Sequence, residues 1–216
     1  MPEVILNNLP FLLHGFGLTA ALALITIVGG TLAGLAVGIA RFLNVPVLSQ
    51  ISAVYVEFIR GTPLLVVLFI TYFAFPALLQ YRTTAFAAAA VGFILFIGAY
   101  IAEDIRAGLR SVEAGQVDAG LAIGLTRAQV LRLIVVPQAV RRMIPALFNQ
   151  YVRLTKFTSV ASVIGVTEFT GAALLVNARE FQPVPIILTV AATYLVVCYA
   201  LSLIGRALYA RLAAQT

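Results

Sequence analysis

Apolar residues fill most of the chain in long runs, and short polar stretches separate these runs. The first run covers residues 15–40 and carries no charged side chain, while a helix needs about 20 residues to cross a bilayer. Four further apolar runs follow it. The pattern therefore predicts an all-α membrane protein, a single domain over residues 1–216, with five transmembrane helices at about 15–40, 51–80, 84–105, 143–177 and 184–206.

Glycine and proline mark two features of these predicted helices. Gly30, Gly34 and Gly38 recur at four-residue spacing in the first run, which favours close helix packing over a transport role. In the second run Gly61 loosens the helix and Pro63 removes a backbone donor. We expect a bend there, at the inner side of the membrane.

The one long polar interruption, about residues 111–137, lies between the third and fourth runs. Gly124 can end a helix in the left-handed conformation, and Thr126 with Gln129 has the spacing of a capping box for a new helix. These signals predict a short helix over about 116–123, a tight turn, and a second helix from about Arg127. Pro137 then disturbs or ends that second helix. An ordinary polar loop is the alternative.

The basic residues predict the topology. If five spans alternate, Arg41, the group 106–142 and Arg206 with Arg211 fall on one side of the membrane. By the positive-inside rule this side is the cytoplasm, so the N-terminus is outside and the C-terminus is cytoplasmic. The net charge of +6 therefore reflects topology rather than nucleic-acid binding. The first residues lack a basic segment typical of a cleaved signal peptide, so we expect the first span to be retained.

The polar interruption resembles the conserved cytoplasmic loop of ABC importer permeases. That loop runs Glu-Ala-Ala, three residues, Gly, nine residues, Ile, two residues, Pro. Here Asp118, Ala119 and Gly120 begin the pattern, with aspartate for glutamate and glycine for the second alanine; Gly124, Ile134 and Pro137 complete it at matching intervals. The resemblance implies a type I ABC importer-like fold whose coupling helix binds an ATPase. The candidate ATPase-coupling residues are Gln116, Asp118, Ala119, Gly120, Ala122, Gly124, Leu125 and Thr126.

Three other segments resemble polar amino acid permeases of the same class. They are Arg-Gly-Thr-Pro from Arg60, Ala-Tyr-Ile-Ala-Glu ending at Glu103, and the stretch 149–165, where Phe157 replaces a usual aspartate and Arg153 adds a cation. The candidate substrate-pathway residues are Glu57, Arg60, Thr62, Glu103, Asn149, Arg153, Lys156, Ser159, Ser162 and Glu168.

Two interpretations of these residues stay open. Glu57 can pair with Arg60, and Glu103 with Arg106, across one helical turn. Asn149, Arg153 and Lys156 share a helical face, and charges within a bilayer face protein or water. They either line a pathway or form a structural ion-pair network. Exposed cations favour an acidic or amide amino acid as substrate, whereas dominant acids favour a basic one.

The resemblance implies a function and a set of partners. It indicates the membrane subunit of an importer for a polar amino acid in the bacterial inner membrane, with two ATPase subunits, a second permease copy or related chain, and an extracytoplasmic binding protein. The chain lacks a Gly-x4-Gly-Lys-Ser/Thr phosphate loop, so we expect ATP and Mg to be used by the ATPase and no cofactor to bind this chain.

Two other classes of function are less favoured. An ion-coupled secondary transporter or channel is the main alternative, but no inverted repeat is evident and the polar segment would have no task. A membrane enzyme would need a base, a metal centre or a nucleophile pair. With one histidine, His14, and one cysteine, Cys198, the sequence offers neither a metal centre nor an internal disulfide.

Overall fold

The computed structural model describes residues 2–213, and in this range the chain is helical without strands. In chain order the elements are α1 (Pro2–Asn7), α2 (Leu9–Phe42), α3 (Leu48–Gly61), α4 (Leu64–Phe69), a π-helical turn (Ile70–Ala74), α5 (Phe75–Leu79), α6 (Ala85–Arg110), α7 (Ala114–Ala122), α8 (Arg127–Val130), a second π-helical turn (Leu131–Val135), α9 (Val136–Phe157), a 3-10 helix (Thr158–Ile164), α10 (Phe169–Glu180) and α11 (Pro183–Ala213).

Long apolar helices confirm the predicted helical membrane fold. Three of them, α2, α6 and α11, are each long and apolar enough to span a bilayer. Two further spans are bent pairs: α3 with the segment from Leu64 to Leu79 bends by 112°, and the segment from Arg127 to Ile164 with α10 bends by 49°. Counting each bent pair as one span gives five.

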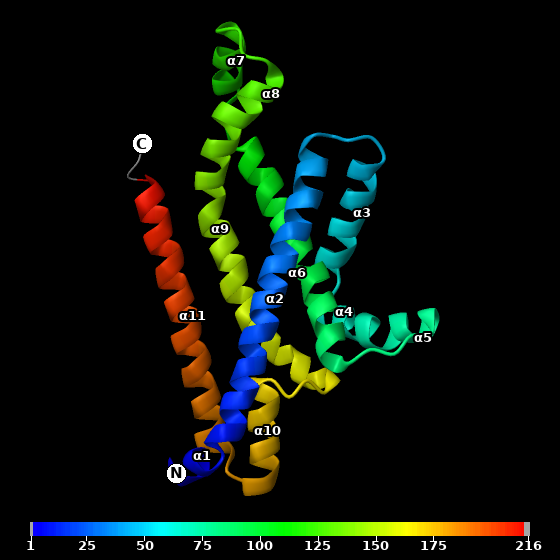
Figure 1. Ribbon diagram of the computed structural model, residues 1–216, viewed down its shortest axis with the longest axis vertical. Helices are drawn as coiled ribbons and strands as arrows, with labels where there is room; N and C mark the ends of the chain where they lie inside the picture. The colour runs from blue at the N-terminus through cyan, green and yellow to red at the C-terminus, as the bar shows by residue number, and fades with distance from the viewer. Residues whose placement is uncertain (1, 214–216) are drawn as a thin grey trace.

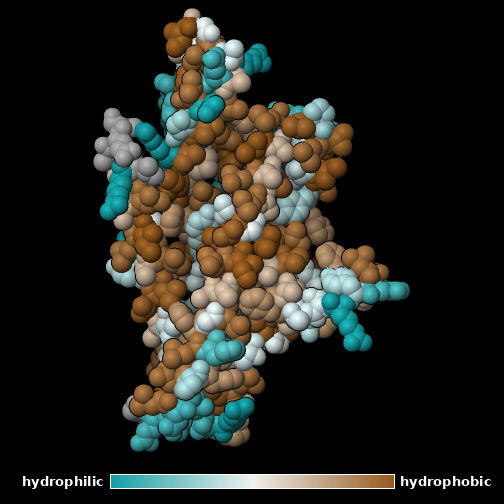
Figure 2. Space-filling view, viewed as in Figure 1, coloured by the Kyte–Doolittle hydropathy of each residue, from teal (hydrophilic) through white to brown (hydrophobic). Residues whose placement is uncertain are grey.

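The spans run along the long axis of the molecule (Figure 1). Helices α7 and α8, the connection from α2 to α3, and the C-terminal end of α11 lie toward one end, whereas α1 and α10 lie at the other. Figure 2 shows hydrophobic surface over the middle of the visible face, with hydrophilic residues gathered at both ends and at the tip of α5. This distribution fits a chain whose middle is solvated by lipid.

Helices α2 and α6 form the core of the protomer through the predicted glycine stripe. A Cβ added at Gly30 would lie 2.1 Å from Ile97, and one added at Gly34 would lie 2.5 Å from Ile101. Gly38 meets the backbone of α6 in the same way. The packing interpretation of this stripe is therefore confirmed.

The second span breaks where Gly61 and Pro63 predict a bend. Thr62 between them is extended, with φ −101° and ψ 134°, because the residue before a proline avoids the helical region. Helix α3 starts at the same end of the molecule as α7, and the break follows its 14 residues, a rise of roughly 21 Å from that start.

Pro137 disturbs its helix without ending it. Since proline cannot donate to the carbonyl four residues earlier, the backbone widens into the π-helical turn at Leu131–Val135 and then continues as α9. The fourth span is thus continuous with the helix that begins at Arg127, well before the apolar run.

Candidate functional site

The polar interruption folds as the predicted helical hairpin. Gly124 adopts φ +87°, its N–H donates to the Leu121 carbonyl at 3.0 Å, and the Leu125 N–H donates to the Gly120 carbonyl at 3.2 Å. These bonds satisfy carbonyls at the end of α7, and only glycine takes this backbone region without strain.

The predicted capping box opens α8. The Gln129 N–H donates to Thr126 Oγ1 at 3.3 Å, and the Thr126 N–H donates to Gln129 Oε1 at 2.8 Å. Helix α7 begins at Ala114, two residues before the expected start, and α8 begins at Arg127 as expected. We call residues 114–130 the hairpin.

Gly120, one of the candidate coupling residues, faces its own chain rather than the outer surface of the hairpin. It is buried, and a Cβ added there would lie 2.7 Å from Ile134 Cδ1 and 2.9 Å from Val130. This position of the motif therefore closes α7 onto the following helix. Among the other candidate coupling residues, Leu125 is half-buried. The remaining ones are exposed: Gln116, Asp118, Ala119, Ala122, Gly124 and Thr126.

The hairpin presents apolar side chains beyond the hydrophobic body. Ile123 at its tip is 77% exposed, and Leu133 beside it is 59% exposed. A hollow of about 400 Å³ lies between α7 and the start of α9 and is lined by both side chains. A second hollow, of about 710 Å³, lies between the hairpin and the end of α2 at Phe42. Exposed apolar surface of this kind is typical of protein-interaction sites.

Polar contacts fix the hairpin to the membrane helices. Gln138 on α9 donates to Gln116 on α7 at 3.3 Å, and Arg142 donates to the Ser111 carbonyl at the end of α6. Gln138 thus links α7 to α9, and Arg142 links α9 to the end of α6.

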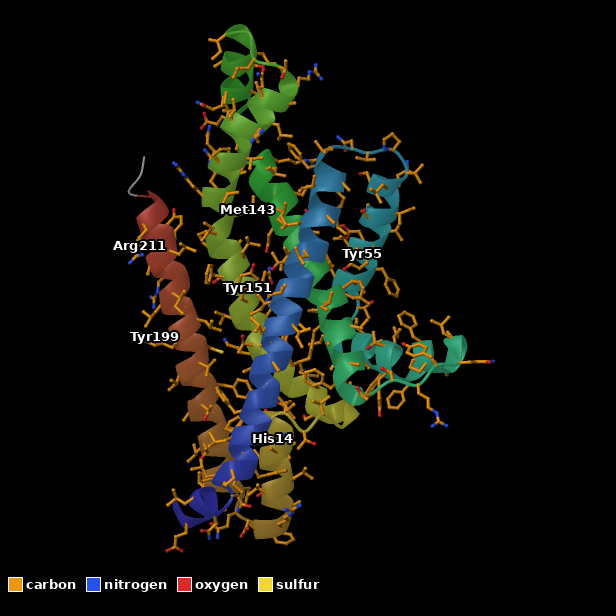
Figure 3. All side chains as sticks on the ribbon, in the orientation of Figure 1. His14, Tyr55, Met143, Tyr151, Tyr199 and Arg211 are labelled. Carbon is orange, nitrogen blue, oxygen red and sulfur yellow. The ribbon has the colours of Figure 1, made fainter. Side chains whose placement is uncertain are left out.

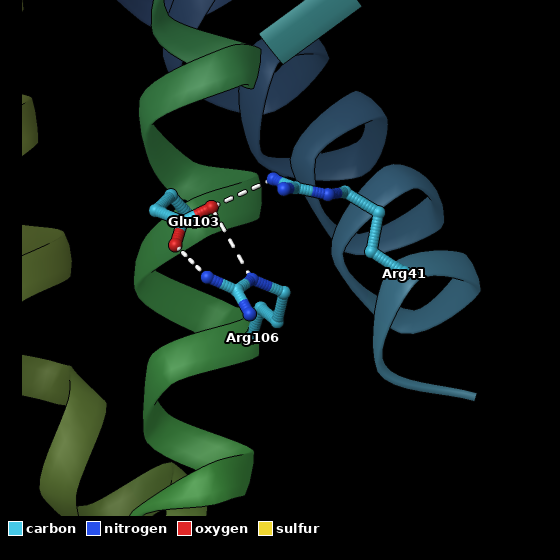
Figure 4. Close-up of polar contacts among 3 residues, drawn as sticks. All are labelled: Arg41, Glu103 and Arg106. Atoms are coloured by element: carbon cyan, nitrogen blue, oxygen red, sulfur yellow. Dashed lines mark hydrogen bonds and ion pairs between the residues drawn. The ribbon is translucent and has the colours of Figure 1, made fainter. Parts of the chain in front are cut away.

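Glu103 on α6 pairs with two arginines near the hairpin end (Figure 4). Its carboxylate meets Arg106, as the sequence predicts, and Arg41 Nη1 on α2 at 2.6 Å. Sequence reasoning used Arg41 only to assign topology, since a contact 62 residues away leaves no local signal. The carboxylate of Glu103 is thus already neutralised by the chain itself.

The ring of Tyr100 makes cation–π contacts with both arginines that the sequence analysis assigned to membrane-spanning segments. The guanidinium of Arg60 on α3 lies 5.5 Å from the centroid of the ring, and that of Arg153 on α9 lies 5.3 Å from it. The possible pair of Glu57 with Arg60 is absent from the ion pairs of residues 2–213. Arg60 sits in the last turn of α3 and stacks on the ring instead.

Glu168 has a structural position that differs from that of the other pathway candidates. Its side chain is fully buried and caps α10 by accepting from the N–H groups of Thr170 and Gly171, at 3.0 and 2.8 Å. It also accepts from Thr19 Oγ1 at 3.1 Å and Tyr194 Oη at 3.0 Å. A carboxylate held by four donors of its own chain does not face a pathway here, so the structure does not place Glu168 with the others.

The other candidates lie on α9, the 3-10 helix after it, and the end of α3. Asn149 and Lys156 are exposed, and Asn149 lines a groove of about 420 Å³ between α9 and α11 that also includes Tyr199 (Figure 3). The hydroxyls of Ser159, Ser162 and Thr62 donate to carbonyls three or four residues earlier. Among the residues that the structure describes, no three His, Cys, Asp or Glu side chains gather in a way that could hold a metal ion.

The fold and the hairpin together define a class: a multi-pass helical membrane protein with a small helical hairpin outside its apolar body. Residues 27–214 match the family described as binding-protein-dependent transport system inner membrane component. The chain belongs to this family, and it is a multi-pass protein of the inner membrane.

Curated relatives agree with this assignment over most of the chain. A probable glutamine ABC transporter permease of Bacillus subtilis (strain 168) is 41% identical, covering 95% of each chain. The glutamine transport system permease of Escherichia coli (strain K12) is 38% identical, covering 94% of each.

Solved structures share the fold. A crystal structure of an amino acid ABC transporter with histidines matches at 28% identity and a TM-score of 0.90, over 96% of each chain. An inward-facing methionine ABC transporter matches at 17% identity and a TM-score of 0.79, which shows the fold alone.

Proposed function

We propose that this chain is the membrane-spanning subunit of an ATP-driven importer for a polar amino acid, with glutamine as the first candidate. The relatives of highest similarity reported above are glutamine permeases, at 38–41% identity over nearly the full length. The single structural observation that carries the proposal is the hairpin, whose motif residues form an ordered helix with an exposed apolar tip at Ile123.

An ATPase subunit is the partner that fits the hairpin. The hairpin lies at the end of the molecule that carries the dense basic residues, which the positive-inside rule assigns to the cytoplasm. Exposed apolar side chains on an ordered hairpin in water favour a protein partner over solvent. Because Gln138 links α7 to α9 and Arg142 links α9 to the end of α6, closure of two ATPases would move these helices and rearrange the pathway.

A second permease protomer would complete the pathway. Arg60 and Arg153 are exposed in the protomer although they lie within the apolar body. Intramembrane charges face protein or a water-filled cavity rather than lipid, so another chain must cover this face. An extracytoplasmic binding protein would deliver the amino acid at the opposite end, near α1 and α10.

Reconstitution tests the proposal directly. The permease, its ATPase and its binding protein are placed in proteoliposomes, and uptake of radiolabelled L-glutamine is followed with ATP or with a non-hydrolysable analogue inside. We expect uptake with ATP inside and no uptake with the non-hydrolysable analogue. Uptake that needs only an ion gradient, without the ATPase, would overturn the importer and favour a secondary transporter.

A further inference from the structure

The intramembrane candidates are not balanced in charge. Glu103 is held by two arginines near the hairpin end, and Glu168 is buried as a helix cap, so neither carboxylate is free to face a pathway. Arg60, Arg153 and Lys156 are exposed and form no ion pair within residues 2–213. The structure thus separates the acids from the cations, which the sequence left open.

The two arginines lie about halfway across the membrane. Arg153 follows Arg142 by 11 residues along a continuous helix, a rise of roughly 16 Å, against a hydrocarbon layer of about 30 Å. Arg60 lies 12 residues beyond the start of α3, a rise of roughly 18 Å from the same end. A side chain at this depth is too far from a helix end to reach the membrane surface easily.

Tyr100 is the ring that both guanidinium groups contact, although they come from different helices. They lie 5.5 and 5.3 Å from its centroid, so the sum of the two distances puts their central carbons at most about 11 Å apart. Two like charges drawn to one ring repel each other unless an anion or water joins them. Guanidinium groups in pairs are well suited to bind a carboxylate through several hydrogen bonds.

A second protomer cannot remove this excess of cations. Glu57 and Asp104 are the remaining acids near this face, and Asp104 already accepts a hydrogen bond of 2.8 Å from Gln150. Lys156 follows Arg153 by three residues on the same helix, so three cations stand against these two acids in each protomer, and Asp104 lies close enough to both arginines to offset part of their charge. A second copy of this chain keeps the same ratio, which leaves room for an anion. Phe157, one residue after Lys156, packs on Phe96 and supplies no charge.

The break in the second span opens the backbone at the same depth. Helix α3 ends at Gly61, directly after Arg60, and the chain turns by 112°. Broken helices at the bilayer midplane form substrate sites in many transporters, since they bring polar groups to a cavity. The arginines therefore lie beside backbone that a ligand can approach.

We propose that Arg60 and Arg153, gathered on Tyr100, bind the carboxylate of the transported amino acid halfway across the membrane. The site accepts neutral polar and acidic amino acids and rejects basic ones, because a second positive charge would add to the cation excess. This inference rests on the proposed importer function and names the substrate class of its pathway.

The test measures binding to the permease itself. The purified complex of permease and ATPase in nanodiscs, without the binding protein, is titrated with L-glutamine, L-arginine and L-glutaminamide, which lacks the carboxylate. We expect L-glutamine to bind, and the other two probes to bind at least about tenfold more weakly, roughly the loss of one charge-assisted hydrogen bond.

Variants assign the binding to the two arginines. Arg60→Gln and Arg153→Gln are expected to weaken L-glutamine binding by about tenfold or more, and Arg153→Lys by less, since it keeps the charge but not the planar fork. Arg179→Gln is the matched control, because Arg179 also stacks on an aromatic ring, Phe11, but in α10 at the other end. It should bind L-glutamine as the unmodified complex does.

The site would be overturned by unchanged L-glutamine affinity in both Arg60→Gln and Arg153→Gln. It would also be overturned if the unmodified complex transports L-glutamine but binds L-glutaminamide or L-arginine equally well. The same holds if that transporting complex binds none of the probes. Transport by the unmodified complex keeps these results separate from a failure of the importer function, in which no ATP-dependent uptake occurs at all.

Discussion

Gln150 on α9 donates a hydrogen bond of 2.8 Å to Asp104 on α6, and its side chain is only 8% exposed. The bond lies between the hairpin end and the arginine site at Tyr100. It joins the same two helices that Arg142 joins through the Ser111 carbonyl. Helices α6 and α9 are thus bonded at two levels, and we expect movement at α7 to reach the membrane interior through both bonds.

Gln150→Leu should loosen this connection. The substitution fills a similar volume but leaves Asp104 without its donor in a partly buried place, which costs about 1–3 kcal/mol. We expect lower transport per ATP hydrolysed, with the ATPase still bound. The ratio of uptake to hydrolysis in proteoliposomes measures this, and an unchanged ratio would show that the bond is not part of the coupling.

Gly120→Val should distort the hairpin from within. The added side chain meets Ile134 and Val130, so α7 must shift away from the following helix. We expect the permease to reach the membrane but to retain little ATPase on purification. Gly115→Val on the same helix is the matched control, since a Cβ there meets nothing within 4 Å; equal loss of ATPase in both variants would contradict the packing role of Gly120.

Glu103→Gln should destabilise the protomer. The change removes the charge that holds Arg41 and Arg106 and leaves two cations close together between α2 and α6. Because the groups are partly exposed, we expect a loss of about 1–3 kcal/mol, seen as a lower Tm in detergent. Glu113→Gln, an exposed carboxylate in the connection after α6, should leave Tm unchanged; a Tm of Glu103→Gln that matches this control would mean that the cluster adds nothing to stability.

Glu168→Ala should impair folding rather than substrate choice. It removes the cap of α10 and the acceptor for Thr19 and Tyr194, all inside the protomer. Loss of a buried cap and its hydrogen bonds costs about 2–4 kcal/mol. We expect low yield and a lowered Tm, with the preference among amino acids unchanged in whatever protein is recovered. A stable Glu168→Ala variant with an altered preference among amino acids would show that Glu168 contributes to the substrate pathway.

Local sequence signals predicted the hairpin because its bonds are local. Gly124 and the pair Thr126–Gln129 act within a few residues, and the structure has them as predicted. The five spans could also be predicted from local sequence, because a helix that crosses lipid must have a certain length and an apolar composition.

Contacts between distant helices could not be read from the sequence. Arg41 with Glu103 and Thr19 with Glu168 are separated by 62 and 149 residues, and nothing local specifies them. Glu57 and Arg60 could pair by their spacing, but Arg60 lies over the Tyr100 ring on another helix instead. Intramembrane acids usually face cavities, but the Glu168 carboxylate instead accepts hydrogen bonds from four donors of its own chain.

The most direct test of the account is binding of the ATPase to the hairpin tip. Ile123→Glu places a charge on a side chain that is 77% exposed, so the fold of the permease should persist. Leu48→Glu, at the first turn of α3 and the same end of the molecule, serves as the control. The account predicts that Ile123→Glu inserts normally but loses both co-purifying ATPase and ATP-driven L-glutamine uptake, whereas Leu48→Glu keeps both. Full ATPase binding and uptake in Ile123→Glu would contradict it.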